Sequence, residues 1–179
     1  MSKDQKKDLL VFLQSFDEDL QELALWLREW VWDLYPHANE LIYDNYNALA
    51  FGWSPTDRQG HIFGSVALYR GGNVHFGFYW GAELADPEKL LLGAGNQYRY
   101  ILVQNKRDFP KAYIKKLLKE AYANSLGKVK DPRQLMEGTT IVKLVSAKKR
   151  APLPKKAHPS SGHRAYQNRT VRSFRTKHN

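Results

Sequence analysis

The sequence contains no cysteine, and this absence excludes several kinds of chemistry at once. None of the 179 residues offers a thiol that could form a disulfide, ligate zinc or an iron–sulfur cluster, or act as a nucleophile. Long apolar runs are missing as well, because the run at residues 9–13 is too short for a signal-peptide core or a membrane span. We therefore expect a cytoplasmic protein without a membrane partner.

Acidic residues are missing from the C-terminal part of the chain. The whole sequence has 28 Lys and Arg against 18 Asp and Glu, a net charge of +10. Residues 148–179 hold ten of the basic residues and no acidic one, so residues 1–147 are electrically neutral. That length suits one domain with a buried core. We expect a single domain over residues 1–147 and a basic, disordered tail over residues 148–179.

Two long helices are predicted from apolar residues at three- and four-residue spacing. The first covers residues 17–35 and ends before Pro36, and a shorter helix over residues 6–14 is expected to precede it. The second begins near Asp108 and Pro110 and is expected to end at Gly127.

Between the long helices, aromatic and β-branched residues punctuated by turns predict strands. The expected strands cover residues 43–53, 61–69, 74–80 and 99–104, with an edge strand at 139–145 and a helical turn at 86–91. Helices that bracket hairpin-connected strands indicate an α+β fold, with an antiparallel sheet and both long helices on one face.

The hairpin around Gly71 and Gly72 is the most specific local prediction, because glycines supply the positive φ of a tight turn. A two-residue loop there would place Ser65, Ala67 and Tyr69 on the helix-covered face. The opposite face would then carry four residues that could floor a shallow pocket for a planar ligand, although polar side chains there are few. The four residues are Gly64, His75, Gly77 and Tyr79.

Three short motifs follow one another along the chain. They are YNALAFGW at residues 46–53, GAELADP at 81–87, and LLGAGN at 91–96 followed by Arg99. Over roughly residues 20–125 the chain resembles the YdhG-like family of bacterial domains of unknown function, some of which are described as frataxin-like intracellular iron chaperones. The resemblance implies a frataxin-like α+β sandwich, iron as a bound metal and a metal-accepting protein as a partner. Many relatives carry an acidic residue where Leu92 stands here.

The first long helix carries a stripe of carboxylates. Glu18, Glu22, Glu29 and Asp33 are spaced four, seven and four residues apart, which places them on one helix face. Like-charge pairs at this spacing cost roughly 0.2–0.5 kcal/mol each, so a bound cation would relieve them. The stripe predicts weak metal binding, and the resemblance points to iron.

Two alternatives to a metal site exist for this stripe. Charged helix faces commonly serve solubility. The second long helix also offers a ladder of lysines, Lys111, Lys115 and Lys119, that would form inter-helix ion pairs if both helices lie on the same face.

The glycine loop before the fourth strand is a candidate anion site. Gly93, Gly95 and Asn96 would offer backbone N–H groups, and Arg99 would add a guanidinium. The spacing matches no nucleotide-binding loop. The alternative is a tight turn with Arg99 in a structural ion pair.

The basic tail is a candidate nucleic-acid-binding arm, since cations that neutralise phosphates release counterions. The alternative is a solubilising extension. The candidate residues are Lys148, Lys149, Arg150, Lys155, Lys156, Arg164, Arg169, Arg172 and Arg175.

Taken together, these features predict a binding or chaperone-like domain that handles metal on its acidic helix, with association to nucleic acid through the tail as the alternative. The sequence shows no catalytic triad, paired-carboxylate motif or zinc signature, so we do not expect an enzyme.

Overall fold

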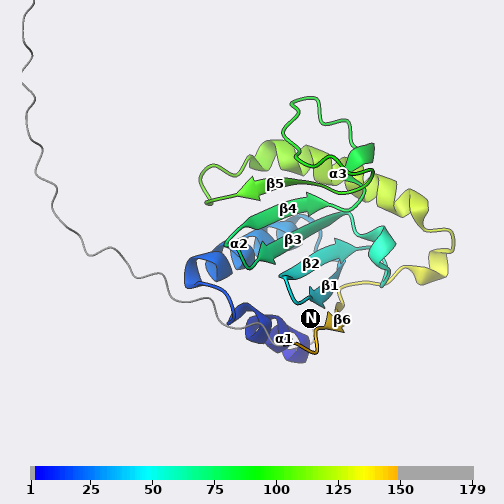
Figure 1. The fold of residues 1–179 in the computed structure, drawn as a ribbon. Helices are drawn as coiled ribbons and strands as arrows, with labels where there is room; N and C mark the ends of the chain where they lie inside the picture. Colours follow the sequence, from blue (N-terminus) through cyan, green and yellow to red (C-terminus); the bar gives the residue numbers. More distant parts are fainter. Residues whose placement is uncertain (1–2, 149–179) are drawn as a thin grey trace, which may run out of the picture.

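The computed structural model describes residues 3–148, which form a six-stranded sheet with helices packed against it (Figure 1). The helices are α1 (Lys3–Leu13), α2 (Glu18–Leu34) and α3 (Lys111–Lys128), with single 3-10 turns at Gln59–His61, Gly81–Glu83 and Pro132–Gln134. The strands are β1 (Asn39–Asp44), β2 (Ala48–Ser54), β3 (Gly64–Tyr69), β4 (Val74–Phe78), β5 (Arg99–Val103) and β6 (Thr140–Val145).

The strands lie in the order β5-β4-β3-β2-β1-β6. All neighbours pair antiparallel except β1 and β6, which are parallel. The predicted α+β class is therefore confirmed, and the sheet is mostly antiparallel as expected, with one parallel pair that was not expected. The long excursion through α3 between β1 and β6 permits parallel pairing, which a short hairpin would not.

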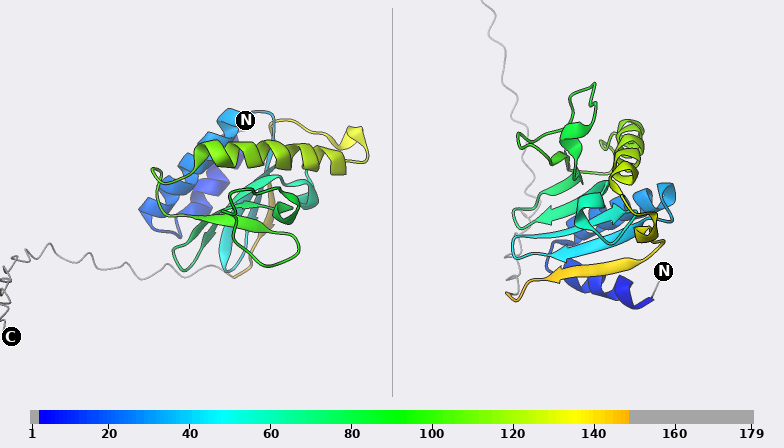
Figure 2. Two further views of the ribbon diagram at one scale, coloured as in Figure 1. Left: turned by 90° about the horizontal axis from the view of Figure 1, so that it is seen from above. Right: turned by 90° about the vertical axis from the view of Figure 1, so that its right-hand side faces the viewer.

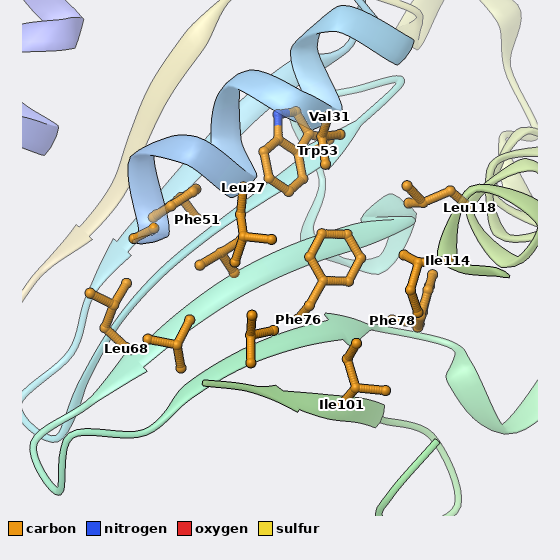
Figure 3. Close-up of a cluster of buried hydrophobic side chains, with 14 of the residues drawn as sticks. Leu27, Val31, Phe51, Trp53, Leu68, Phe76, Phe78, Ile101, Ile114 and Leu118 are labelled. Atoms are coloured by element: carbon orange, nitrogen blue, oxygen red, sulfur yellow. The ribbon is translucent and has the colours of Figure 1, made fainter. Parts of the chain in front are cut away.

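Helices α2 and α3 lie on the same face of the sheet, and the opposite face carries no helix among the described residues (Figure 2). The core fills the space between the two layers (Figure 3). Leu27 and Val31 of α2 and Ile114 and Leu118 of α3 are fully buried there, together with Phe76 of β4. Apolar side chains from the helices and from the sheet thus pack together in one core.

The limits of the helices differ in detail from the sequence-based expectation. α3 starts at Lys111, just after the expected start at Asp108 and Pro110, and it continues through Gly127 to Lys128, so Gly127 does not end it. A Cβ at Gly127 would meet no atom within 4 Å, which shows that the glycine lies on the outer side of the helix.

The expected single strand over residues 43–53 is wrong, because this region holds two strands and a turn. β1 already begins at Asn39, and the chain reverses at Asn45–Asn47, where the Asn45 amide donates to the Ala48 carbonyl at 2.9 Å. Asparagine favours turns because its side chain can bond to nearby backbone and it tolerates left-handed conformations.

The β3–β4 hairpin is present, but its predicted register is wrong by one residue. Tyr69 pairs with Asn73 across a three-residue loop, and Gly72 adopts the left-handed conformation with φ +82°. A loop that is one residue longer than expected shifts the pairing of the strands by one residue. The side chains of one strand then point to the opposite face of the sheet from the one expected. Ser65 and Ala67 therefore share the helix-free face with His75 and Gly77, while Gly64 lies on the core side against Leu118.

The segment at residues 86–91 is a turn and not the expected helical turn. Asp86 and Lys89 have positive φ angles of 38° and 52°. The Asp86 carboxylate accepts hydrogen bonds from the amides of Leu90 and Leu91, both at 3.1 Å. The acidic side chain thus caps this turn, although no helix follows it.

Candidate ligand-binding groove

The helix-free face of the sheet is hollowed into a groove with a volume of about 440 Å³. This volume lies within the range of small-molecule sites. None of the described residues that line the groove is charged, and four are tyrosines. The lining residues are Tyr43, Asn45, Ala50, Phe51, Gly52, Gln59, Ile62, Ser65, Ala67, Tyr69, Tyr79, Gln97, Tyr98 and Leu144.

The hollow arises because small residues of the central strands lie between bulky residues of the outer strands. Cα partners across the sheet run from Tyr43 of β1 through Ala50 of β2 and Ala67 of β3 to His75 of β4. Successive side chains on a strand point to opposite faces. In β2 the large residues therefore enter the core, and the alanines and glycine form the floor of the groove.

Tyr98 forms one wall of the groove by lying across Gly77. A Cβ built on Gly77 would be 2.0 Å from the Tyr98 hydroxyl oxygen, so only glycine permits this position of the ring. Ser65, directly opposite Gly77, donates a hydrogen bond to the Gly77 carbonyl at 3.4 Å. The absence of a side chain at Gly77 of β4 therefore leaves room for the ring of Tyr98, which lies in the loop before β5.

Aromatic rings continue from the groove onto the neighbouring strands. The rings of His75 and Tyr100 are stacked, with centroids 4.0 Å apart and an interplanar angle of 1°. Tyr69 lies on the other side of His75 at 4.5 Å, and Tyr98 is 5.8 Å from Tyr100. These four rings form one aromatic cluster over the strands β3, β4 and β5.

Burial shifts the pKa of four titratable groups on this face toward the neutral form. Burial raises the pKa of Tyr43 to about 12, with contributions from Tyr79 and Asp57. Burial also raises the pKa of Tyr69 and of Tyr98, the latter in spite of a hydrogen bond with Ser65. The pKa of His75 is lowered by burial. The groove therefore suits an uncharged, planar or apolar group.

Two polar atoms on this face are buried without a hydrogen-bond partner among the described residues. They are the hydroxyl oxygen of Tyr43 and the Nδ1 atom of His75. Buried polar atoms are normally satisfied, because each unsatisfied one costs about 1–3 kcal/mol. Tyr43 is a lining residue of the groove, and its buried hydroxyl is one of these unsatisfied groups.

The sequence contained part of this site. His75, Gly77 and Tyr79 lie on the helix-free face as expected, whereas the placement of Gly64 there is wrong. Tyr43 and Tyr98 were not predicted as site residues. The floor of the groove could have been predicted from β2, because small and large residues alternate from Ala48 to Trp53.

The four carboxylates of the predicted metal site are all exposed on α2. The structure does not gather them, as no group of three or more potential metal-binding side chains occurs within residues 3–148. Glu22 lies 4.0 Å from the Lys106 ammonium group. Metal binding by Glu18, Glu22, Glu29 and Asp33 stays a prediction.

The lysine ladder of α3 does not supply the ion pair that is seen at Glu22, because Lys106 precedes the helix. Lys111 instead lies over the ring of Trp26 at 4.8 Å, a cation–π contact between the two helices.

The glycine loop at residues 93–96 uses Arg99 internally. The guanidinium donates hydrogen bonds to the carbonyls of Gly95 and Tyr98, the latter at 2.9 Å. Gly93 has a φ of +115°. The carbonyl oxygens, not the amides, thus face Arg99, and an anion site formed by Gly93, Gly95, Asn96 and Arg99 stays a prediction without support from these contacts.

The predicted nucleic-acid-binding residues fall almost wholly outside the described residues. Lys148 is exposed at the end of the described chain, three residues after β6, and the others from Lys149 to Arg175 lie beyond it.

Within residues 3–148, no helix combines the length and the apolar character needed to cross a bilayer. Comparison of the chain with models of protein families, with curated proteins and with solved structures gives no match. Any function must therefore be argued from the groove and its surroundings.

Proposed function

We propose that this protein is a non-enzymatic binding domain for single-stranded nucleic acid. In this proposal the groove holds unpaired bases, and the cations that follow β6 hold the phosphates. The observation that carries it is the position of the groove. Leu144 of β6 lines the groove, and the chain continues from β6 directly into the basic residues 148–179.

The side chains that line the groove are suited to binding nucleic-acid bases. Every base has a π face, and stacking on an aromatic side chain contributes about 1–3 kcal/mol per base. Tyr69, Tyr79 and Tyr98 offer such rings. Gln59 and Gln97 add amide donors and acceptors that can meet base edges. An uncharged groove suits neutral bases and leaves the phosphates to cations elsewhere.

The division between an aromatic surface and a separate basic segment also agrees with known modes of single-strand binding. Sheets that display aromatic residues bind bases by stacking, and basic segments contribute affinity without sequence preference. In fold, we assign the domain to the YdhG-like, frataxin-resembling sandwiches on the resemblance described above. Iron handling on α2 is the rival function, and the groove plays no part in it.

Fluorescence anisotropy of a labelled single-stranded oligonucleotide, titrated with the full chain at low salt, tests the proposal. We expect Tyr79→Ala to weaken binding roughly 5- to 150-fold, the equivalent of losing one stacked base. Tyr46→Ala is the matched control, because Tyr46 is an exposed tyrosine that does not line the groove. Equal affinities of the two variants, or no binding by the wild type, would refute the proposal.

The salt dependence of binding tests the role of the tail separately. For single strands the logarithm of the binding constant falls with the logarithm of the salt concentration with a slope of about −0.7 per neutralised phosphate. Changing Arg164, Arg169, Arg172 and Arg175 to Gln should reduce the slope by up to about 3. An unchanged slope would remove these arginines from the proposal.

A further inference from the structure

One wall of the groove is formed by the connection between β2 and β3, which contains the 3-10 turn η1 (Gln59–His61). Gln59 and the following Ile62 line the groove. The Cγ2 atom of Ile62 would be only 2.8 Å from a Cβ built on Gly52, so Ile62 packs directly on the floor. His61 lies between these two lining residues in the sequence, and its side chain has different partners.

The ring of His61 is hydrogen-bonded through both of its nitrogens. The Nδ1 atom lies 2.8 Å from the Thr56 hydroxyl oxygen, and the ring also donates to the backbone of Lys128, the last residue of α3. The donated proton is therefore on the other nitrogen, and Nδ1 accepts from the Thr56 hydroxyl. That hydroxyl oxygen accepts from the Arg58 amide at 3.1 Å. Thr56 and His61 are both buried, so this network is complete only with a neutral imidazole.

The backbone of η1 is held at the same place. The Ser125 hydroxyl of α3 donates to the His61 carbonyl, and the Trp80 indole donates to the Gly60 carbonyl at 2.7 Å. The Lys128 ammonium group lies over the Trp80 ring, 4.5 Å from its centroid. The position of this wall of the groove thus depends on contacts with the C-terminal end of α3.

From this network we propose that η1 is an acid-sensitive wall of the groove. When the His61 ring takes up a second proton, η1 separates from α3, and the groove loses the wall that Gln59 and Ile62 form. A ligand held in the groove is then released. The opening of the wall is a property of the free protein, and only the release of nucleic acid rests on the function proposed above.

A second proton on the ring does not fit the closed arrangement. It would turn Nδ1 into a donor that faces the Thr56 hydroxyl, whose own proton would then lose its acceptor. The new charge would also be buried, which is costly unless the charge is paired. The nearby carboxylates already have partners. Glu83 lies 2.9 Å from the Lys128 ammonium group. Asp57 lies 3.4 Å from the Lys143 ammonium group.

The surroundings of the ring set the direction of the pH dependence. Burial lowers the pKa of His61 below its ordinary value of 6.5, and Arg58 lowers it further. The hydrogen bond to Lys128 and the charge of Asp57 act in the opposite direction without reversing the shift. In an opened turn the ring contacts water and regains its ordinary pKa. Between the two pKa values, the ratio of opened to closed molecules therefore rises by up to about tenfold for each pH unit of acidification.

Nuclear magnetic resonance of the full chain between about pH 7.5 and pH 5 tests the proposal. The ring resonances of His61 report its protonation, and hydrogen exchange of the Ile62 amide, which donates to the Gln59 carbonyl at 3.1 Å, reports the turn. A single turn does not persist without its packing contacts. We expect Ile62 exchange, relative to that of an unstructured peptide, to rise by up to about tenfold per pH unit as His61 is protonated. The amide of Phe76 in the core should not respond.

Three variants assign the response to His61. His61→Gln cannot be protonated, so its Ile62 exchange should be the same at both ends of the pH range. His37→Gln removes an exposed histidine and should preserve the response, as should His75→Gln, which removes the other histidine on the helix-free face. Thr56→Val removes the donor that favours the neutral ring. This variant should raise the pKa of His61 and move the opening to higher pH, which tests the proposal even if His61→Gln does not fold.

Ile62 exchange that does not respond to pH in the wild type, or that responds equally in His61→Gln, overturns the proposal. Faster exchange at every amide, including Phe76, shows global unfolding in acid and also overturns it. Oligonucleotide anisotropy at the two ends of the pH range tests the release, and the affinity of the wild type relative to His61→Gln should fall in acid. An unchanged ratio overturns the release. If no oligonucleotide binds at either pH, the function proposed above fails, while the exchange data still decide whether the wall opens.

Discussion

Arg28 of α2 and Glu40 of β1 form a buried, bidentate ion pair. The Arg28 Nε and Nη2 atoms donate to the two Glu40 carboxylate oxygens at 2.5 and 2.7 Å, and the side chains are 5% and 0% exposed. Thr140 of β6 donates a third hydrogen bond to Glu40 at 3.2 Å. One carboxylate thus connects the helix α2, the strand β1 and the parallel edge strand β6, which borders the groove.

The first prediction concerns this pair. Arg28→Met should lower the free energy of unfolding by about 3–5 kcal/mol, because it leaves the buried charge of Glu40 without its partner. Replacing both residues, as in Arg28→Met with Glu40→Met, should cost less than the single change. Urea unfolding measures both. As a control, Arg133→Met removes an exposed arginine and should leave the midpoint unchanged.

The second prediction concerns the hairpin loop. Gly72→Ala should destabilise the protein by about 1 kcal/mol, since Gly72 has a φ of +82° that a side chain disfavours. Gly71→Ala is the matched control, because Gly71 has no positive φ and its Cβ would meet no atom closer than 3.9 Å. Equal midpoints for the two variants in urea would show that the loop does not need the left-handed residue.

The third prediction concerns the contact between Gly77 and Tyr98. Gly77→Ala should displace the Tyr98 ring and cost about 1–3 kcal/mol, as expected for overpacking. A displaced Tyr98 ring would be less buried, so the pKa of Tyr98 should move closer to the ordinary tyrosine value. Ultraviolet absorbance at alkaline pH measures this pKa. Gly60→Ala, which has no neighbour within 4 Å of the added Cβ, should change neither property.

The fourth prediction concerns Tyr43 and alkaline pH. Its pKa is raised from 10.0 to about 12 in the folded protein, so above pH 10 the unfolded chain binds fewer protons than the folded one. Stability should therefore fall as the pH rises from 10 to 12. Tyr43→Phe should weaken this decline. At pH 7 the same variant should not be less stable than wild type, because the buried hydroxyl has no partner within the described residues. A clear loss of stability at pH 7 would contradict this assignment.

Several elements of the fold were predictable from local patterns. The apolar spacing of α2 and α3 and the alternation within β3 and β4 correspond to the two side-chain periods of helices and strands. The division of the stretch at residues 43–53 was missed because its turn contains no glycine or proline, only Asp44, Asn45 and Asn47 near its centre.

The faces of the sheet were less predictable than its strands. A change of one residue in the β3–β4 loop exchanged Ser65 and Ala67 with Gly64 between the two faces. Both loop lengths agree with the same glycine pair in the sequence. The small residues of the strands therefore indicated a groove, but the sequence could not show which of them form its floor.

The sequence by itself determined the helices, most of the strands and the separation of a neutral domain from a basic tail, because these depend on neighbours along the chain. Only the tertiary structure decided that Glu40 would be buried with Arg28, that β6 would join β1 in parallel, and that Tyr43 and Tyr98 would border one groove. Those relationships join residues far apart in sequence, and they depend on register and on the packing of whole elements, which local patterns do not encode.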